Sequence, residues 1–133
     1  MADGRSEGQI RAIDAETGER RGEVVRTAGQ AYLAPHPDGR HVYYNSLDGH
    51  RELYFLYDLF RVDRETGDRE RLTSGRRARE PALSPDGRRI AYVVNGAGTR
   101  HLMIADVDDI EGTERVLLRN RRFEQVYTPR FSP

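Results

Sequence analysis

The 133-residue sequence contains no cysteine and no tryptophan, and all 22 of its basic side chains are arginine because lysine is also absent. Without cysteine the chain forms no disulfide and has no thiolate to act as a nucleophile or a metal ligand. It also lacks any apolar run near the roughly 20 residues that a membrane-spanning helix needs. Neither cysteine chemistry nor membrane insertion is therefore expected.

An excess of charge of either sign is missing as well, because 22 acidic residues balance the 22 basic ones. A balanced chain has no electrostatic reason to bind nucleic acid or an anionic membrane, so neither is expected as a partner. The exclusive use of arginine, together with abundant glycine and alanine, indicates codon bias in a GC-rich genome. Selection for bidentate anion binding is the alternative explanation.

The N-terminus lacks the apolar stretch of a signal peptide, and residues 1–8 are expected to be flexible. The sequence leaves the compartment open. Either the chain is cytoplasmic or its export signal lies outside the sequence.

Two turn signals recur at nearly the same interval. The first is a Pro-Asp-Gly tripeptide, found at Pro37, Asp38 and Gly39 and again 48 residues later at Pro85, Asp86 and Gly87. The second is a Thr-Gly pair, found at Thr17 and Gly18 and again 49 residues later at Thr66 and Gly67. Proline presets φ, aspartate bonds the backbone ahead of it and glycine tolerates positive φ, so each signal is expected to close a hairpin.

Runs rich in β-branched and aromatic residues flank these turns, as in Val42–Tyr44 and Ile90–Val94. Each period then holds four short strands, and four strands in about 48 residues predict one propeller blade. The expected fold is an all-β partial β-propeller made of four-stranded antiparallel meanders. The expected boundaries are 9–27 for a partial blade, 31–74 and 80–119 for two full blades, and 126–133 for the first strand of the next.

One segment, His50–Tyr57, does not fit this pattern. Two stretches, one around Leu53 and one at Leu59–Asp63, both align with the third strand of the following repeat. We interpret the segment as an insertion or a strand extension between the second and third strands of its blade. The helical spacing of Leu53, Leu56, Tyr57 and Phe60 leaves a short helical piece as the alternative.

The residues of the second repeat resemble a known family. Glu80–Tyr92, together with Asp58–Thr73, resembles the WD40-like "PD40" repeat of TolB-type β-propellers, and Tyr127–Pro133 resembles the start of a further copy. The likeness covers most of residues 9–133, although Leu83 and Phe131 stand where such repeats often carry tryptophan. Propellers of this family usually have six or more blades. The chain is therefore expected to be a fragment of a larger protein, with closure of a ring by two or three chains as the alternative.

No catalytic, metal or cofactor site is predicted. The pattern Gly-x-Ser-x-Gly occurs at Gly4–Gly8, but it lies in the expected flexible terminus and not between a strand and a helix, so it does not indicate a catalytic serine. The four histidines show no His-x-x-x-His spacing. Asp38 and Asp86 occupy matched positions and are interpreted as turn residues rather than paired catalytic carboxylates. The acidic residues of one loop could supply Ca²⁺ ligands, but without an EF-hand pattern a solvated loop is favoured. These residues are Asp106, Asp108, Asp109 and Glu111.

The geometry of a meander suggests where a partner would bind. Both repeated turns lie at one end of the strands, so the other connections meet at the opposite end. That end receives paired arginines and an aromatic segment, residue types that are favoured at interface hot spots. The predicted partner-binding residues are Arg76, Arg77, Arg121, Arg122, Tyr54, Phe55 and Tyr57.

The resemblance implies a non-catalytic TolB-like scaffold that mediates protein–protein interaction, with a periplasmic location in bacteria. The alternative is the substrate-gating propeller of a prolyl-oligopeptidase-type serine peptidase whose catalytic domain is absent here. The expected partner is a protein, and self-association through open sheet edges is a further expectation. The sequence beyond Pro133 would separate the two functions.

Overall fold

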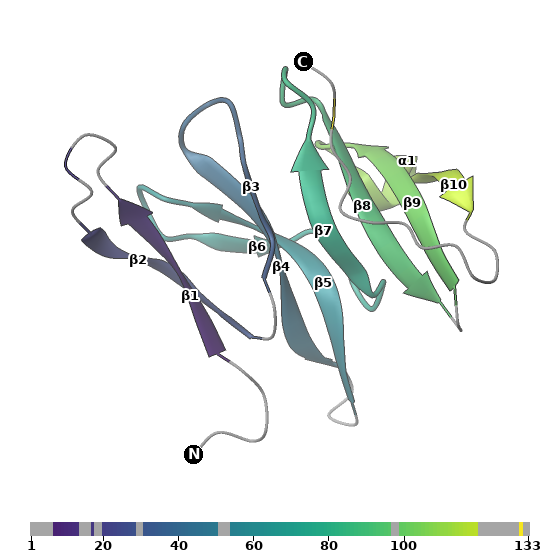
Figure 1. The fold of residues 1–133 in the computed structure, drawn as a ribbon, viewed down its shortest axis with the longest axis horizontal. Helices are drawn as coiled ribbons and strands as arrows, with labels where there is room; N and C mark the ends of the chain where they lie inside the picture. Colours follow the sequence, from purple (N-terminus) through teal and green to yellow (C-terminus); the bar gives the residue numbers. More distant parts are fainter. Residues whose placement is uncertain are drawn as a thin grey trace.

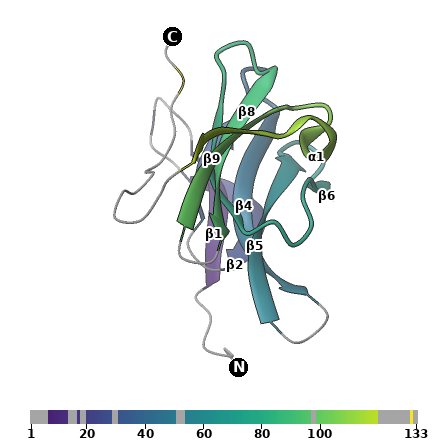
Figure 2. The same cartoon turned by 90° about the vertical axis from the view of Figure 1, so that its right-hand side faces the viewer.

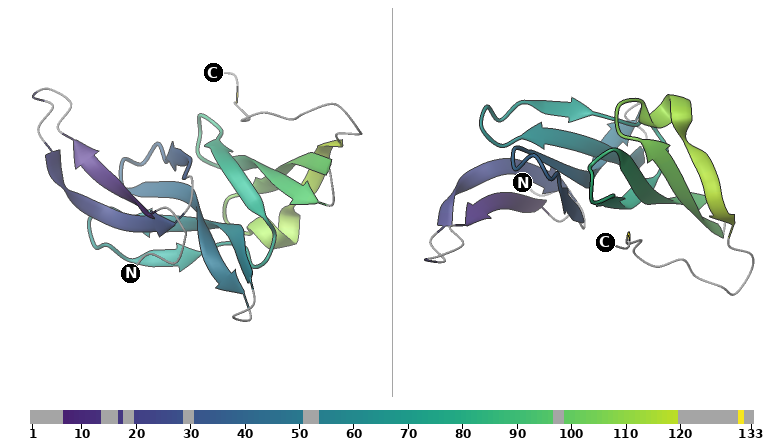
Figure 3. Two further views of the ribbon diagram at one scale, coloured as in Figure 1. Left: turned by 60° about the horizontal axis from the view of Figure 1, so that its bottom comes forward. Right: turned by 90° about the horizontal axis from the view of Figure 1, so that it is seen from above.

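The computed structural model describes residues 7–13, 17, 20–28, 31–50, 54–96, 99–119 and 131. These residues form three antiparallel sheets that follow one another in chain order across the molecule (Figures 1 and 3). The single helix found among them, α1 (Ile110–Thr113), has four residues. No helix in this part of the chain is long and apolar enough to cross a membrane.

The first four-stranded sheet is a simple meander. Its order is β3 (Leu33–Pro35), β4 (His41–His50), β5 (Tyr54–Asp63) and β6 (Arg69–Arg71). The Pro-Asp-Gly turn joins β3 to β4, and the Thr-Gly turn joins β5 to β6. Consecutive strands therefore pair with each other, as short hairpin connections require.

The second four-stranded sheet repeats this arrangement. It contains β7 (Ala78–Leu83), β8 (Arg89–Gly96), β9 (Thr99–Asp106) and β10 (Arg115–Arg119), again in chain order. The two remaining strands, β1 (Glu7–Ile13) and β2 (Arg20–Ala28), pair into a two-stranded sheet. The predicted all-β partial propeller of four-stranded meanders is thus confirmed.

Some sequence predictions fall outside the described residues. These are residues 1–6 of the expected flexible terminus, Gly18 of the first Thr-Gly pair, and residues 126–133 except Phe131. Of the residues 1–8, Glu7 and Gly8 begin β1.

The segment that did not fit the repeat is a strand extension. β4 and β5 pair without a register shift from His41 opposite Asp63 to His50 opposite Tyr54. The helical alternative is wrong, because all of β5 is strand, so Leu56, Tyr57 and Phe60 lie on an extended backbone. The second sheet differs in another way, since its last loop contains α1, whose N-terminus is capped by Asp109 Oδ1 accepting from the Gly112 N–H at 3.0 Å.

The main core lies between the two four-stranded sheets, which stack face to face with the second in front of the first in Figure 2. Tyr43 and Leu59 of the first sheet share one buried cluster with Ile90 and Tyr92 of the second. Because successive strand residues point to opposite faces, Tyr44 belongs to a smaller cluster on the far side of the first sheet. Each fully buried large side chain stabilises the packing by about 1.5–3 kcal/mol.

Candidate functional site

The two Pro-Asp-Gly turns have the same backbone geometry. Gly39 and Gly87 both have φ of 72°, the left-handed region that glycine adopts without steric cost. Asp38 Oδ1 accepts hydrogen bonds from the N–H groups of Arg40 (2.8 Å) and His41 (3.0 Å). In the other turn, Asp86 Oδ1 accepts from the N–H of Arg88 at 3.0 Å. Both carboxylates therefore bond the backbone of their own turns.

The Thr66–Gly67 turn lies beside the first Pro-Asp-Gly turn. Asp63 Oδ1 accepts from the N–H of Thr66 at 3.3 Å, and Gly67 has φ of 79°. The Arg64 N–H donates to the carbonyl of Arg40 at 2.9 Å, and Arg40 Nε donates to Asp63 Oδ2 at 2.7 Å. These contacts place both kinds of turn at one end of the sheet, which we call the turn end.

His36 joins the turn ends of the two sheets. The N–H of Asp38 donates to Nδ1 of His36 at 3.1 Å, so this nitrogen carries no proton. Nε2 therefore carries the proton and donates to the carbonyl of Gly87 at 3.1 Å, across 51 residues of sequence. His41 lies beside it and donates from Nδ1 to Asp38 Oδ2 at 2.6 Å.

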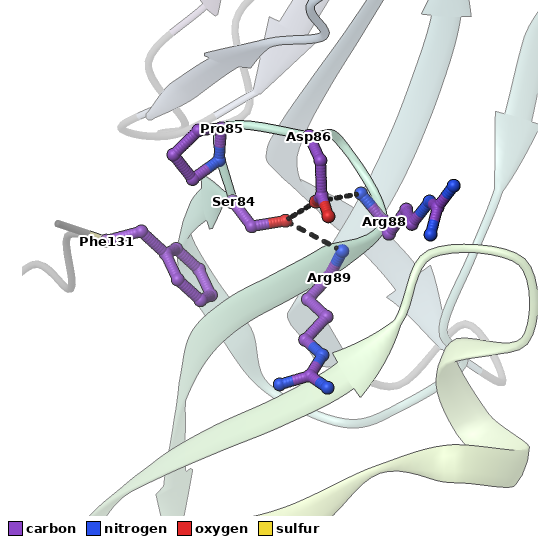
Figure 4. Close-up of a pocket in the computed structure, with 6 residues that line it drawn as sticks. All are labelled: Ser84, Pro85, Asp86, Arg88, Arg89 and Phe131. Carbon is purple, nitrogen blue, oxygen red and sulfur yellow. Dashed lines mark hydrogen bonds between the residues drawn. The ribbon is translucent and has the colours of Figure 1, made fainter. Parts of the chain in front are cut away.

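Ser84 occupies the repeat position that matches His36 but makes local contacts. Its hydroxyl donates to Asp86 Oδ1 at 2.7 Å and accepts from the N–H of Arg89 at 3.0 Å. Figure 4 shows these bonds, with the ring of Phe131 beside Ser84 and the side chain of Arg88 pointing away from that ring. These residues line a hollow of about 390 Å³. The short serine closes its own turn, whereas the histidine reaches the next sheet.

The end opposite the turn end is called the hairpin end, because the β4–β5 hairpin projects there (Figure 1). Arg76, in the connector before β7, is held by ion pairs to the α1 loop. Its Nε donates to Glu111 Oε2 at 3.1 Å, which raises the pKa of the Arg76 guanidinium, and its Nη2 lies 3.1 Å from Glu114 Oε1. The hydroxyl of Tyr92 donates to the other oxygen of Glu114 at 2.5 Å. Arg76 therefore anchors the α1 loop to the connector before β7.

A buried carboxylate positions that connector. Asp58 is only 2% exposed and accepts hydrogen bonds from the N–H groups of Gly75 (2.8 Å) and Arg76 (3.0 Å). It also accepts from Thr73 Oγ1 at 2.8 Å and from Arg71 Nη1 at 2.9 Å. Four donors satisfy a charge that would be costly to bury alone. Nothing in the local sequence pattern marked Asp58, because its partners follow 13 to 18 residues later.

The other predicted partner-binding residues are only partly brought together. Tyr57 lies under the guanidinium of Arg79, whose Cζ is 4.4 Å from the ring centroid. Arg77 is exposed and has φ of 56°, and its carbonyl accepts from the N–H of Asn95 at 3.3 Å. Tyr54 and Phe55 lie in β5 near the hairpin tip, but their side chains are outside the described set, as are Arg121 and Arg122 entirely.

Asn45, in the middle of β4, connects the two four-stranded sheets. This fully buried side chain accepts at Oδ1 from the N–H groups of Tyr32 (3.0 Å) and Glu80 (3.3 Å). The carboxylate of Glu80, itself at φ of 56°, accepts from Arg100 Nη2 at 2.9 Å. Sequence reasoning did not identify these residues, although the 48-residue spacing of Tyr32 and Glu80 is a usable signal.

Within the described residues, no group of three histidine, aspartate or glutamate side chains is placed to hold a metal ion. In the acidic loop, Asp109 caps α1 and Glu111 pairs with Arg76. His36 and His41 take part in the turn contacts above, and His101 Nε2 lies 3.3 Å from Thr99 Oγ1. The side chain of His50 is outside the described set.

No protein-family model matches the sequence, and no curated protein matches it. Solved structures do match. TolB from Acinetobacter baumannii is 23% identical with a TM-score of 0.67, over 84% of this chain and 27% of that one. Putative TolB from Agrobacterium tumefaciens is 25% identical with a TM-score of 0.65, over 83% and 37%. The β-propeller domain of the Trilobed protease from Pyrococcus furiosus is 17% identical with a TM-score of 0.58, over 88% and 36%.

The chain thus spans between about a quarter and just over a third of the length of the TolB structures that it matches. Its sheets have the strand order of propeller blades, and the repeated turns join the strands within each one. Sequence motif, sheet topology and structural similarity agree. The chain therefore has a TolB-type β-propeller fold.

Proposed function

We propose that the chain belongs to a non-catalytic propeller scaffold that binds a protein partner at the hairpin end. The observation that carries this proposal is the length of the β4–β5 hairpin. Its strands have ten residues each, whereas β3 and β6, which flank them, have three. The hairpin therefore extends well beyond the other strands of its sheet (Figures 1 and 2).

The base of this hairpin is held rigidly. Tyr57 packs under Arg79 of the second sheet. Asp58 accepts hydrogen bonds from Arg71 of β6 and from three residues of the connector between the sheets. A preorganised surface loses less conformational entropy on binding than a mobile one. Tyrosine and arginine are also the residue types that contribute most to protein interfaces. Arg77, two residues before Arg79 in the sequence, is exposed and adds a second cation to this stretch of chain.

Site-specific photocrosslinking in the source cells tests the proposal. A benzophenone amino acid at position 55, near the hairpin tip, is expected to crosslink one partner protein. Position 65 is the matched control, because Glu65 is highly exposed (69%) but lies at the turn end. Equal crosslinking of the same partner from position 65, or none from position 55, would contradict binding at the hairpin end.

The peptidase alternative rests on the similarity to the Trilobed protease propeller, which supports the fold alone. A gating propeller would belong to a protein that cleaves peptides. The full-length protein should therefore be assayed with a fluorogenic peptide, with and without a serine-reactive fluorophosphonate. Under our proposal it shows no inhibitor-sensitive hydrolysis, and such hydrolysis would favour the alternative.

A further inference from the structure

A polar hollow of about 290 Å³ lies at the turn end between the two four-stranded sheets. We call it the inter-blade hollow. Five segments line it: the β3–β4 turn, β4, β5, the β7–β8 turn and the loop after β9. Its volume lies near the lower end of ligand pockets, which suits a single side chain better than a whole cofactor.

Carboxylates predominate around this hollow. Asp38 belongs to the first sheet, and Asp86 and Asp108 belong to the second. Two guanidinium groups also line it. The charge of Arg61 is offset by the carboxylate of Glu70, to which Arg61 donates a hydrogen bond. Three negative charges therefore face one uncompensated positive charge, that of Arg88. The carboxylate of Asp108 makes no ion pair or hydrogen bond with any residue that the structure describes.

Two of these carboxylates stay ionised in neutral and mildly acidic solution. Partial burial raises the pKa of Asp38, but hydrogen bonds from His41 and Arg40 outweigh it and bring the net pKa well below its ordinary value. The hydroxyl of Ser84 and the N–H of Arg88 lower the pKa of Asp86. The negative charge of the hollow is therefore permanent under physiological conditions.

Aromatic rings form the other wall. His36 lies 6.0 Å from Tyr43 and 6.5 Å from His41, measured between ring centroids. Tyr43 lines the hollow and is almost completely buried. Rings beside carboxylates are the surroundings that guanidinium and ammonium groups prefer, because both the ring faces and the acidic oxygens attract a cation.

We propose that the inter-blade hollow receives a basic side chain, arginine or lysine, presented by a partner protein. This is a second interface, at the end of the sheets opposite the hairpin, and it does not depend on the function proposed above. The carboxylates come from both sheets, so the bound cation links two neighbouring blades. Between the two Pro-Asp-Gly turns, the structure describes one hydrogen bond, from Nε2 of His36 to the carbonyl of Gly87.

NMR titration of the full chain tests the chemistry of the site. The probes are Nα-acetyl-arginine amide and its neutral isostere Nα-acetyl-citrulline amide. The arginine derivative should give saturable shifts of the His36 and His41 ring signals and of the Gly87 amide, and the citrulline derivative should give none. Because exposed ion pairs contribute modestly, Asp108→Asn should weaken binding by about fivefold. Shifts of equal size with citrulline, or no saturable shift, would overturn the proposal.

Two controls make the result specific. Glu65→Gln, also at the turn end but outside the hollow, should leave arginine binding unchanged. Asp108→Asn is the primary variant because that carboxylate holds no described contact, whereas Asp38→Asn also removes turn hydrogen bonds. Arginine binding that is equally strong in the Asp108→Asn protein would overturn the site.

A peptide probe tests the source of the cation. A glycine–serine peptide with one central arginine should bind at least as tightly as the free derivative, since a partner must deliver its side chain from a backbone. Binding of the free derivative with exclusion of the peptide would overturn the assignment to a protein partner.

Discussion

The carboxamide oxygen of Asn45 accepts a hydrogen bond from the backbone N–H of Glu80 at 3.3 Å, joining two neighbouring blades. The same oxygen accepts from the N–H of Tyr32, which lies one 48-residue period before Glu80. Equivalent positions of the two repeats, just before β3 and within β7, thus share one acceptor. The side chain is fully buried, so bulk solvent does not compete for these two N–H groups.

Asn45→Ala should strongly destabilise the chain. The substitution leaves two backbone N–H groups without this acceptor, and each buried unsatisfied donor costs about 1–3 kcal/mol. We expect the free energy of unfolding in urea to fall by about 2–4 kcal/mol. Glu65→Gln, an exposed control, should change it by less than about 0.5 kcal/mol. A loss for Asn45→Ala as small as that of the control would show that the shared acceptor contributes nothing.

Gly39→Ala and Gly87→Ala form a matched pair, because both glycines have φ of 72°. Each alanine should cost about 1–2 kcal/mol for its left-handed backbone. A Cβ at position 39 meets nothing within 4 Å, whereas a Cβ at position 87 would lie 2.5 Å from His36 Nε2. Gly87→Ala should therefore be the more destabilising variant in chemical denaturation.

A double-mutant cycle identifies the cause of that excess. In a His36→Ala background most of the additional loss at position 87 should disappear, since the imidazole no longer blocks the new methyl group. An excess that persists unchanged in this background would rule out the contact between the two turns.

Asp38→Asn should change how stability depends on pH. The native carboxylate has a lowered pKa, so below about pH 4 the unfolded chain binds a proton that the native chain does not. This contribution to stability is complete above the unfolded pKa and is lost as the pH falls toward the native pKa. The wild-type advantage over Asp38→Asn should therefore be largest near pH 6 and shrink below about pH 4 in urea titrations. An advantage that grows on acidification would contradict this assignment.

Arg77→Ala and Arg76→Ala should have different effects. Arg76 is paired with Glu111 and Glu114, so its loss should reduce stability by up to about 1 kcal/mol, as expected for half-exposed ion pairs. Arg77 is exposed and should instead weaken partner binding with little change in stability. Surface plasmon resonance with the crosslinked partner, together with denaturation curves, measures both. The reverse assignment of effects would show that Arg76 is the residue that contacts the partner.

The fold was largely predictable because its turns are local. Asp38 and Asp86 accept hydrogen bonds from backbone N–H groups two or three residues ahead, and the strands between the turns follow from β-branched and aromatic runs. The secondary structure of His50–Tyr57 was ambiguous, because Leu53, Leu56, Tyr57 and Phe60 also satisfy a helical spacing. Only the pairing of His50 with Tyr54 decides it.

The candidate site was less predictable because its contacts join distant segments. Arg76 was expected to face a partner, but the loop that contains Glu111 returns to it from 35 residues away. Likewise, Arg79 reaches Tyr57 only because two sheets stack. The Pro-Asp-Gly end was interpreted as structural from turn chemistry alone, and the inter-blade hollow arises there from the spacing of two adjacent turns.

Shortening the β4–β5 hairpin tests the central claim most directly. Leu47 pairs with Tyr57 in the native register, so replacing residues 48–56 by Asn-Gly closes the hairpin with a two-residue turn and keeps the Tyr57–Arg79 contact. The measurement is the dissociation constant of the partner for this variant and for the wild-type chain. Binding at the hairpin end predicts a folded variant whose affinity is at least about tenfold weaker, equivalent to about 1.4 kcal/mol. A folded variant that binds the partner with unchanged affinity would contradict it.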